Sequence, residues 1–219
     1  MSDKVIIRAL GRCDYQLTYE LMQQFTAARD ETTNNEIWLL EHPPVLTLGT
    51  SAVESHILDA GNTPVVKTDR GGQVTWHGPG QLMVYLLLDL KPLRLTVKSL
   101  VRNMELAVME TLSPYGIQAK CRANAPGVYV DERKISSLGI RVKRGCTYHG
   151  LAINISNDKN AFSGINPCGY PGLDTVRVND LTEEKSLDDV AKDLLPNLIS
   201  NLNLKNHTQV FTSEHWQQP

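Results

Sequence analysis

The stretch Arg70-Gly71-Gly72-Gln73-Val74-Thr75-Trp76-His77-Gly78-Pro79-Gly80-Gln81 runs directly into the apolar segment Leu82-Met83-Val84-Tyr85-Leu86-Leu87-Leu88. The first stretch contains four glycines and one proline, and the second has the composition of a buried strand. Glycine adopts backbone angles that are closed to other residues and lets a ligand approach the main chain closely. The sequence therefore predicts a binding-site floor at the entrance to a buried strand. The alternative is a tight structural connection.

Three polar side chains of this stretch, Arg70, His77 and Gln81, supply groups that a purely structural turn does not need. The glycines do not match the common nucleotide-binding motifs. The stretch lacks the Gly-Lys-Ser/Thr ending of a Walker A loop, and it is not a Gly-x-Gly-x-x-Gly sequence after a strand. The pattern therefore indicates a binding loop but does not by itself name a ligand.

The chain of 219 residues is long enough for one substantial core or two small ones. Its formal net charge of -2 argues against a general nucleic-acid binder, which is usually strongly basic. No apolar run approaches the ~20 residues of a membrane-spanning helix, and the first residues lack a long apolar signal segment. We therefore expect a cytoplasmic protein with neither nucleic acid nor membrane as a partner.

The four cysteines, Cys13, Cys121, Cys146 and Cys168, are spread along the chain and form no Cys-x-x-Cys pair. This spacing does not predict a disulfide framework, and in a reducing compartment each cysteine is by default a small buried residue. No two His, Cys or acidic residues stand at metal-ligand spacing on one predicted element. The sequence therefore predicts no metal site.

Hydrophobic periodicity predicts three helices. The first covers 15–28, with Leu17, Leu21, Phe25 and Ala28 on its buried face. The second covers 97–112 and is capped by Thr96, and the third begins at Ser186 and is kinked or interrupted at Pro196. Strands are predicted over 5–7, 36–40, 45–49, 65–68, 82–90, 127–130, 134–142 and 147–155.

The strands over residues 127–155 are expected to form a meander, with a hairpin turn at Asp131-Glu132-Arg133. We find no internal repeat, low-complexity segment or convincing linker. We therefore expect a single α+β domain over residues 1–219, with a mainly antiparallel mixed sheet flanked by helices. The polar residues 205–219 are expected to be a peripheral tail.

Cys168 lies in Asn166-Pro167-Cys168-Gly169, where proline fixes the backbone before the sulfur and glycine frees it afterwards. A cysteine at such a turn can face a cavity, although a buried turn cysteine is the commoner case. A cysteine nucleophile must be a thiolate, and a free thiol titrates near ~8.5, so a neighbouring cation is needed. Lys134, at the start of a strand, is the best candidate. The alternative is a solvated lysine after a hairpin turn.

Three histidines, His42, His77 and His149, are either reactive or structural residues. His149, on the strand after Lys134, and His77, in the glycine-rich stretch, are candidates to orient or polarise a reactant. Each alone is more often a buried structural histidine. His42, which precedes two prolines, is expected to be structural.

Five segments follow one another along the chain: 70–81, Ala125-Pro126-Gly127-Val128-Tyr129, Lys134-Ile135-Ser136-Ser137-Leu138-Gly139, His149-Gly150-Leu151-Ala152-Ile153-Asn154 and Ile165-Asn166-Pro167-Cys168-Gly169-Tyr170. Together they resemble the lipoyl(octanoyl) transferase family, also called lipoate–protein ligase B. The resemblance covers the chain from roughly residue 35 to residue 172. Trp76 departs from the family, in which tyrosine is common, but keeps an aromatic ring. Residues after 175 carry no motif.

The resemblance implies an acyltransferase that moves an octanoyl group from the phosphopantetheine thioester of acyl carrier protein to a lysine of a lipoyl domain. The lipoyl domains would be those of 2-oxoacid dehydrogenases and the glycine cleavage H protein. The implied fold is that of biotin and lipoate protein ligases, which is similar to class II aminoacyl-tRNA synthetases. The implied nucleophile is Cys168 and the activating lysine is Lys134, with no ATP, metal or other cofactor. The implied acyl-site residues are Arg70, Gly71, Gly72, Gln73, Val74, Thr75, Trp76, His77, Ser137, Leu138, Gly139, His149, Gly150, Leu151 and Ala152.

Two other classes of function stay open on the sequence. One is an ATP-dependent lipoate or biotin ligase on the same scaffold, and the other is a non-catalytic acyl-binding or carrier-binding module. A thioesterase, which would release the free acid when no acceptor is present, is a further, lesser alternative. Arg141, Lys143 and Arg144 form a basic cluster that either docks acidic acyl carrier protein or is a solvated strand end.

Overall fold

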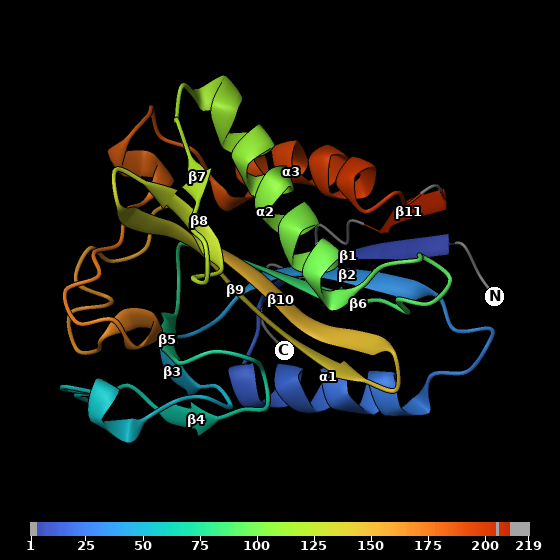
Figure 1. Cartoon of the computed structure of the whole chain (residues 1–219), viewed down its shortest axis with the longest axis horizontal. Helices are drawn as coiled ribbons and strands as arrows, with labels where there is room; N and C mark the ends of the chain where they lie inside the picture. Colours follow the sequence, from blue (N-terminus) through green and yellow to red (C-terminus); the bar gives the residue numbers. More distant parts are fainter. Residues whose placement is uncertain (1–3, 205, 211–219) are drawn as a thin grey trace.

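The computed structural model describes residues 4–204 and 206–210, which form two sheets and three α-helices (Figure 1). The larger sheet has the strand order β11-β1-β2-β6-β10-β9-β8-β7, and the smaller has the order β4-β3-β5. The strands are β1 (Lys4–Arg12), β2 (Asn35–Glu41), β3 (Val45–Leu48), β4 (Val65–Lys67), β5 (Val74–His77), β6 (Gln81–Leu87), β7 (Lys120–Cys121), β8 (Gly127–Val130), β9 (Arg133–Lys143), β10 (Cys146–Asn154) and β11 (Asn206–Val210). The helices are α1 (Tyr15–Ala28), α2 (Val97–Leu112) and α3 (Leu187–Asn201).

The larger sheet is mixed and mainly antiparallel. Strand β6 pairs antiparallel with β2 and β10, and β9 pairs antiparallel with β10 and β8, whereas β1 runs parallel to β2 and β11. Helices α2 and α3 cover one face of this sheet, and α1 covers the other (Figure 1). The expected α+β fold, with a mainly antiparallel mixed sheet flanked by helices, is confirmed.

The main core fills the space between the sheet and the pair α2 and α3. Alternate residues of β6, namely Leu82, Val84 and Leu86, are fully buried there against Met104 of α2 and Leu194 of α3. Burying each such side chain contributes ~1.5–3 kcal/mol, before the entropy of ordering it is counted. The intervening residues of β6 point to the opposite face, because strand side chains alternate. On that opposite face, beneath α1, Met83 and Tyr85 line part of the pocket described below.

The two helices over the main core begin where the sequence predicts. The Thr96 side chain accepts from the Ser99 backbone N–H at the start of α2, and Ser186 caps α3 together with Asp189. Helix α3 continues through Pro196 and is not interrupted there. No helix in residues 4–204 and 206–210 combines the length and the apolar composition needed to cross a membrane.

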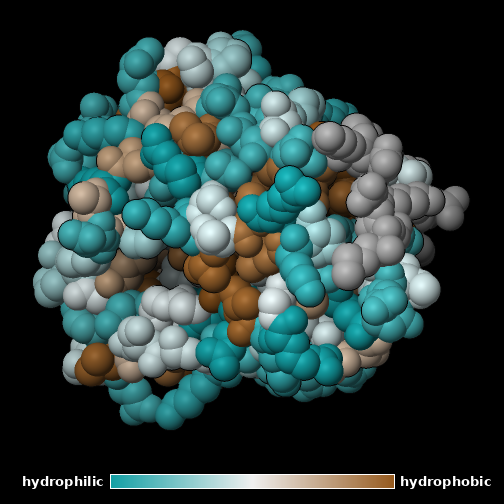
Figure 2. Space-filling view, turned by 45° about the vertical axis from the view of Figure 1, so that its right-hand side comes forward, coloured by the Kyte–Doolittle hydropathy of each residue, from teal (hydrophilic) through white to brown (hydrophobic). Residues whose placement is uncertain are grey.

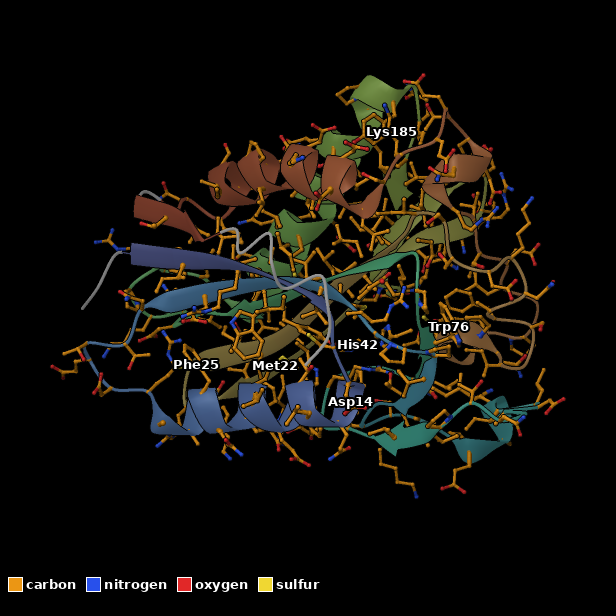
Figure 3. All side chains as sticks on the ribbon, turned by 180° about the vertical axis from the view of Figure 1, so that it is seen from behind. Asp14, Met22, Phe25, His42, Trp76 and Lys185 are labelled. Atoms are coloured by element: carbon orange, nitrogen blue, oxygen red, sulfur yellow. The ribbon has the colours of Figure 1, made fainter. Side chains whose placement is uncertain are left out.

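Helix α1 covers the predicted residues but buries a different face. Its buried side chains are Tyr15, Thr18, Met22 and Thr26, whereas Leu17 and Leu21 are 51% and 45% exposed. Figure 3 shows Met22 and Phe25 pointing from α1 toward the sheet, where both pack against Trp38 and its neighbours. The prediction that Leu17 and Leu21 are buried is wrong because this face of the sheet carries tyrosines and histidines, which Tyr15 and Met22 meet.

Two connections complete the frame. The β8–β9 turn is formed by Asp131 and Glu132, whose φ angles are 46° and 66°, so their backbone twist matches that of the flanking strands. Within the segment expected to be a peripheral tail, residues 206–210 form the edge strand β11, which pairs parallel with β1. Residues 205 and 211–219 lie outside the described residues.

Candidate active site

A pocket of about 380 Å³ opens between loop 70–73, the β9–β10 hairpin and the loop that carries Cys168. Its volume falls in the ~300–1,000 Å³ range of small-molecule sites. Lys134, Cys168 and every acyl-site residue implied by the resemblance line it, except Trp76. Val97 and Tyr170 also line the pocket and are about half exposed, at 48% and 50%. Figure 2 shows hydrophobic residues gathered in the middle of one face, with hydrophilic residues around them.

Small residues on β9 and β10 form part of the pocket wall. Ala152 pairs with Ser137 on one side and with Met83 of β6 on the other. Two residues along, Gly150 pairs in the same way with Gly139 and with Tyr85. Paired residues lie on the same face of a sheet, so four small residues form a shallow floor bounded by the larger Met83 and Tyr85.

Loop 70–73 lies directly on β9 because Gly139 has no side chain. A Cβ at Gly139 would lie 2.9 Å from the carbonyl oxygen of Gly71, which is too close. The backbone N–H of Gly71 donates to the Ile140 carbonyl at 3.0 Å. The predicted floor loop is therefore joined to the sheet by main-chain contact.

Arg70 holds this loop from inside. Its guanidinium donates to the Thr47 hydroxyl and carbonyl (2.8 and 2.7 Å) and to the carbonyls of Gly71 and Gln73 (3.0 and 2.8 Å). Burial lowers the pKa of Arg70 from its ordinary value. Because its guanidinium joins Thr47 of β3 to the carbonyls of Gly71 and Gln73 in the loop, Arg70 shapes the pocket wall as well as lining it.

A buried polar chain runs behind the wall from β3 to β9. The Thr47 hydroxyl meets His77 Nε2 at 3.3 Å, and His77 Nδ1 meets Gln81 Oε1 at 2.8 Å. Gln81 then donates to Asn154, whose amide reaches the Lys134 carbonyl at 3.4 Å. Burial, helped by the charge of Arg70, lowers the pKa of His77 well below its usual value, so His77 is a neutral structural link.

His149 lies at the other side of the pocket with an unusual backbone. Its φ angle is 60°, in the left-handed region that few side chains adopt. Its Nε2 lies 3.3 Å from Asp69 Oδ1, and the Tyr148 hydroxyl also donates to Asp69. Burial lowers the pKa of His149, and the hydrogen bond to Asp69 opposes that change. His149 is therefore tied to the loop residue next to Arg70.

The two predicted reactive groups meet. Lys134 Nζ donates to Cys168 Sγ at 2.9 Å, although 34 positions separate the residues. Lys134 is only 2% exposed, and Cys168 is half-buried. Cys168 has a φ angle of 57°, a left-handed conformation that a non-glycine residue adopts at some cost. The turn predicted around Pro167 and Gly169 thus presents the sulfur to the lysine.

Pairing on both sides of this loop fixes the sulfur. Before Cys168, the backbone N–H of Asn166 donates to the His56 carbonyl at 2.8 Å. After it, the Lys134 N–H donates to the Asp174 carbonyl and the Val176 N–H donates to the Lys134 carbonyl, at 2.9 and 3.0 Å. Both ends of the loop are thereby attached to ordered backbone.

The Lys134 ammonium has two further neighbours. It donates to the Pro126 carbonyl at 3.2 Å and lies 5.1 Å from the centre of the Tyr129 ring. Burial acts to lower the pKa of Lys134, but the charge and hydrogen bond of the Cys168 sulfur, together with Tyr129, act in the opposite direction, and the pKa is raised. The lysine is therefore held as a cation by the sulfur that it contacts.

Trp76 corrects one expectation. Its ring packs against Phe162 with the centroids 5.8 Å apart, in the core of the small sheet with Leu46 and Ile165. Trp76, labelled in Figure 3, belongs to β5, along which successive side chains point in opposite directions. Thr75 and His77 face the pocket, so Trp76, between them, faces the other way.

Several pocket residues were not predicted. Tyr15, Met83, Tyr85, Val97 and Ile140 line it, although none belongs to the acyl-site segments that the resemblance supplied. The alternation of β6 was the available signal for Met83 and Tyr85, since its odd-numbered residues share the face beneath α1. His42, predicted to be structural, is buried and bonded to the Cys13 carbonyl and the Tyr85 hydroxyl (Figure 3).

The basic cluster is partly committed to internal contacts. Arg144 donates to the Ala27 carbonyl at 2.6 Å at the end of α1, and Arg141 lies 3.8 Å from Asp69. Lys143 is exposed. In the described part of the chain no three His, Cys, Asp or Glu side chains are grouped so as to hold a metal ion.

Comparisons with known proteins agree with this geometry. The family model for the lipoyl protein ligase A/B catalytic domain matches residues 14–199. An octanoyltransferase from Laribacter hongkongensis is 51% identical over 201 residues, which is 92% of this chain and 97% of that protein. An octanoyltransferase from Marinobacter nauticus is 49% identical over 97% of this chain and 99% of its own length.

The fold has relatives among solved structures. Lipoate-protein ligase A bound with ATP superposes with a TM-score of 0.77 at 15% identity, covering 99% of this chain and 91% of that one. A biotin protein ligase from Aquifex aeolicus, in complex with biotin and ATP, gives a TM-score of 0.58 at 13% identity, covering 90% of this chain and 70% of that one. At these identities the likeness shows the fold alone. Together with the sequence relatives, it establishes that the chain belongs to the lipoyl protein ligase A/B catalytic domain family and is an octanoyltransferase within it.

Proposed function

We propose that the octanoyl group rests on Cys168 as a thioester between its donor, octanoyl-acyl carrier protein, and its acceptor, a lysine of a lipoyl domain. The observation that carries this proposal is the contact of 2.9 Å between Lys134 Nζ and Cys168 Sγ at the pocket. A thiolate is the reactive form of cysteine, and a neighbouring ammonium favours it. The exchange of one thioester for another is nearly neutral in energy, so the proposal needs neither ATP nor a metal.

In the first half-reaction, the Cys168 thiolate attacks the thioester carbonyl of the donor. The carbon–sulfur bond to phosphopantetheine breaks, and the electron pair leaves with that sulfur. The Lys134 ammonium gives its proton to the departing thiolate, which becomes a thiol. The products are acyl-Cys168, free carrier and a neutral Lys134 amine.

In the second half-reaction, the neutral amine of the acceptor lysine attacks the acyl-Cys168 carbonyl. Lys134 takes one proton from the attacking nitrogen, the carbon–sulfur bond breaks, and Cys168 leaves as a thiolate beside the restored ammonium. Burial favours the neutral lysine and the sulfur charge favours the cation. Acylation of Cys168 removes the sulfur charge, which favours loss of the Lys134 proton in the first half-reaction. Release of the Cys168 thiolate restores the charge, which favours the protonated Lys134 in the second.

The acyl chain is placed along the floor of Ser137, Gly139, Gly150 and Ala152. Loop 70–73 covers this floor at Gly139, and the other three residues line the same pocket as Cys168. Each buried CH₂ contributes ~0.8 kcal/mol, or about a fourfold change in affinity. The length of the floor therefore sets which chains are held.

Acyl carrier protein and lipoyl domains are the proposed partners, including those of 2-oxoacid dehydrogenases and the glycine cleavage H protein. The exposed Lys143 near the end of β9 is the best-placed member of the basic cluster to meet an acidic carrier. Reversing its charge in Lys143→Glu should weaken carrier binding at low salt and leave lipoyl-domain binding intact. Unchanged carrier binding at low salt would remove Lys143 from the interface.

Intact-protein mass spectrometry tests the central proposal. Mixed with octanoyl-acyl carrier protein and no acceptor, the protein should gain the mass of one octanoyl group, and addition of a lipoyl domain should remove it. Cys168→Ala should gain no such mass and transfer nothing. Cys121→Ala, which changes a half-buried cysteine away from the pocket, should behave as the wild type. Full transfer activity in Cys168→Ala would falsify the proposal.

A further inference from the structure

One peptide group lies between the catalytic pair and a buried carboxylate on α2. The Gly127 N–H donates to Glu105 Oε1 at 3.1 Å, and the Pro126 carbonyl accepts from Lys134 Nζ at 3.2 Å. The N–H and the carbonyl belong to the same peptide unit, which joins Pro126 to Gly127. Glu105 is only 7% exposed, and both hydrogen bonds are at least partly buried.

A peptide unit is planar and rigid, so a bond that fixes its N–H also fixes the direction of its carbonyl. Hydrogen bonds in a chain also polarise one another, and this effect is strong where water is excluded. A carboxylate on the N–H side therefore makes the Pro126 oxygen a better acceptor for the ammonium of Lys134. The chain of contacts runs from Glu105 through this peptide and Lys134 to the Cys168 sulfur.

The surroundings leave this peptide little freedom. The Tyr129 hydroxyl donates to the Ala125 carbonyl at 3.1 Å, just before it. Gly127 has a φ angle of 143°, and a Cβ at this position would lie 3.0 Å from Lys134 Cε and 3.1 Å from Nζ. The lysine therefore packs against the bare Gly127 backbone, where a small rotation of the peptide changes the aim of the ammonium.

We propose that Glu105 is a positioning residue for the reaction: through the Pro126–Gly127 peptide it aims the Lys134 ammonium at Cys168. Glu105 does not touch the substrate in this arrangement, since it does not line the pocket. The inference rests on the roles proposed above for Lys134 and Cys168. It requires that residue 105 offer an oxygen that accepts the Gly127 N–H, because a side chain that only fills the same volume would not position Lys134.

Three variants separate these possibilities. Glu105→Leu fills the volume without an acceptor, and Glu105→Gln keeps an oxygen that accepts the Gly127 N–H. Glu110→Leu is the matched control, because Glu110 lies on the same helix and accepts from Asn201 of α3 at 2.6 Å, away from the pocket. The readouts are the rate at which iodoacetamide alkylates Cys168, and kcat and KM for octanoyl transfer. Thermal unfolding of each variant serves as the check on folding.

We expect Glu105→Leu to slow alkylation and lower kcat by about tenfold to 10²-fold, the loss typical of a misplaced catalytic group, with KM almost unchanged. Glu105→Gln should recover most of both rates, and Glu110→Leu should match the wild type. A folded Glu105→Leu with wild-type rates overturns the proposal. So does a Glu105→Gln as slow as Glu105→Leu. If Glu105→Leu does not fold, Glu105→Gln decides, since a loss there of tenfold or more contradicts a requirement for the oxygen alone.

The failure of this inference is distinguishable from failure of the proposed function. If the wild type forms no acyl adduct on Cys168, the proposed function fails, whatever the Glu105 variants do. If the wild type forms the adduct and Lys134→Met slows it while Glu105→Leu does not, only the positioning role of Glu105 is lost.

Discussion

Lys134 pairs through its backbone with Thr175, on the segment that returns from Cys168. This parallel bridge brings the lysine strand and the cysteine loop together at the point where β10 has diverged from β9. Ahead of Cys168 the loop is attached elsewhere, through the hydrogen bond from the Asn166 N–H to the His56 carbonyl. The contact of 2.9 Å between Lys134 Nζ and Cys168 Sγ is therefore a product of backbone pairing, in addition to the attraction between the two side chains.

Replacing the lysine tests its part in both half-reactions. Lys134→Met keeps a long apolar side chain but removes the cation and the proton carrier, so we expect kcat for octanoyl transfer to fall by ~10²-fold or more. Alkylation of Cys168 by iodoacetamide near neutral pH should slow in parallel. Lys192→Met changes an exposed lysine of α3, away from the pocket, and is the control. Equal rates in the two variants would contradict a role for Lys134.

The floor predicts chain-length preference. Ala152→Leu adds bulk between Ser137 and Met83, so octanoyl transfer should suffer more than transfer of a chain two CH₂ groups shorter. At about fourfold per CH₂, two CH₂ groups correspond to a fall of about sixteenfold in the ratio of the two kcat/KM values. Ala28→Leu, at the exposed end of α1, is the control. A ratio that does not change would show that the chain lies elsewhere.

Arg70 is expected to hold loop 70–73 in place through the several N–H donors of its guanidinium group. Arg70→Lys keeps the charge but leaves backbone carbonyls of Thr47, Gly71 and Gln73 without partners in a buried place. We expect a loss of about 3 kcal/mol of unfolding free energy and a raised KM for the acyl donor.

Urea unfolding and steady-state kinetics measure the two effects of Arg70→Lys. The half-exposed Arg8, which pairs with Glu36, gives the comparison variant Arg8→Lys, whose stability should change by less than about 1 kcal/mol. Similar losses in the two variants would count against the anchoring role of Arg70.

The buried His42 is expected to make the unfolding free energy depend on pH. Burial lowers its pKa from 6.5 to about 4, although the hydrogen bond to the Cys13 carbonyl opposes that change. In the neutral form Nδ1 donates to the Cys13 carbonyl and Nε2 accepts from the Tyr85 hydroxyl. The unfolded chain binds the proton first, so this contribution is present above about pH 6.5 and is lost as the pH falls toward 4. The loss near pH 5 should be about 2 kcal/mol.

The variant His42→Asn isolates this contribution. It keeps a donor for the Cys13 carbonyl but does not titrate, so its unfolding free energy should fall less than that of the wild type between about pH 7 and pH 5. Urea titrations at both values measure the difference. A wild type and variant with parallel pH profiles would assign the acid sensitivity to other groups.

Local signals predicted the parts of this fold that depend on neighbours in sequence. The capping of α2 by Thr96 and the turn at Asp131 follow from side chains a few positions away, and both were predicted correctly. The buried face of α1 was not. The stripe of Leu17 and Leu21 and the buried stripe of Thr18 and Met22 are one residue apart on the helix. Only the tyrosines and histidines of the facing sheet select the second.

The site shows the same division. The motif segments supplied residues that line the pocket, because each segment is a short loop or strand with its own chemistry. Alternation along β5 would have directed Trp76 away from the pocket, but a resemblance carried over as a continuous segment includes both faces of a strand. The link from Glu105 to Lys134 could not be predicted from the sequence, because it passes through the Pro126–Gly127 peptide group, and a backbone contact leaves no sequence pattern.

The burial of Lys134 behind the Cys168 sulfur limits the direction from which substrates can reach the two groups. Since only 2% of the lysine is exposed, any group that needs both Sγ and Nζ must arrive from the side on which Cys168 is open. Under the proposed function, the acyl carrier and the lipoyl domain therefore bind in turn at this one opening, and the empty carrier leaves before the acceptor binds. Initial velocities measured against both substrates should accordingly give parallel double-reciprocal lines.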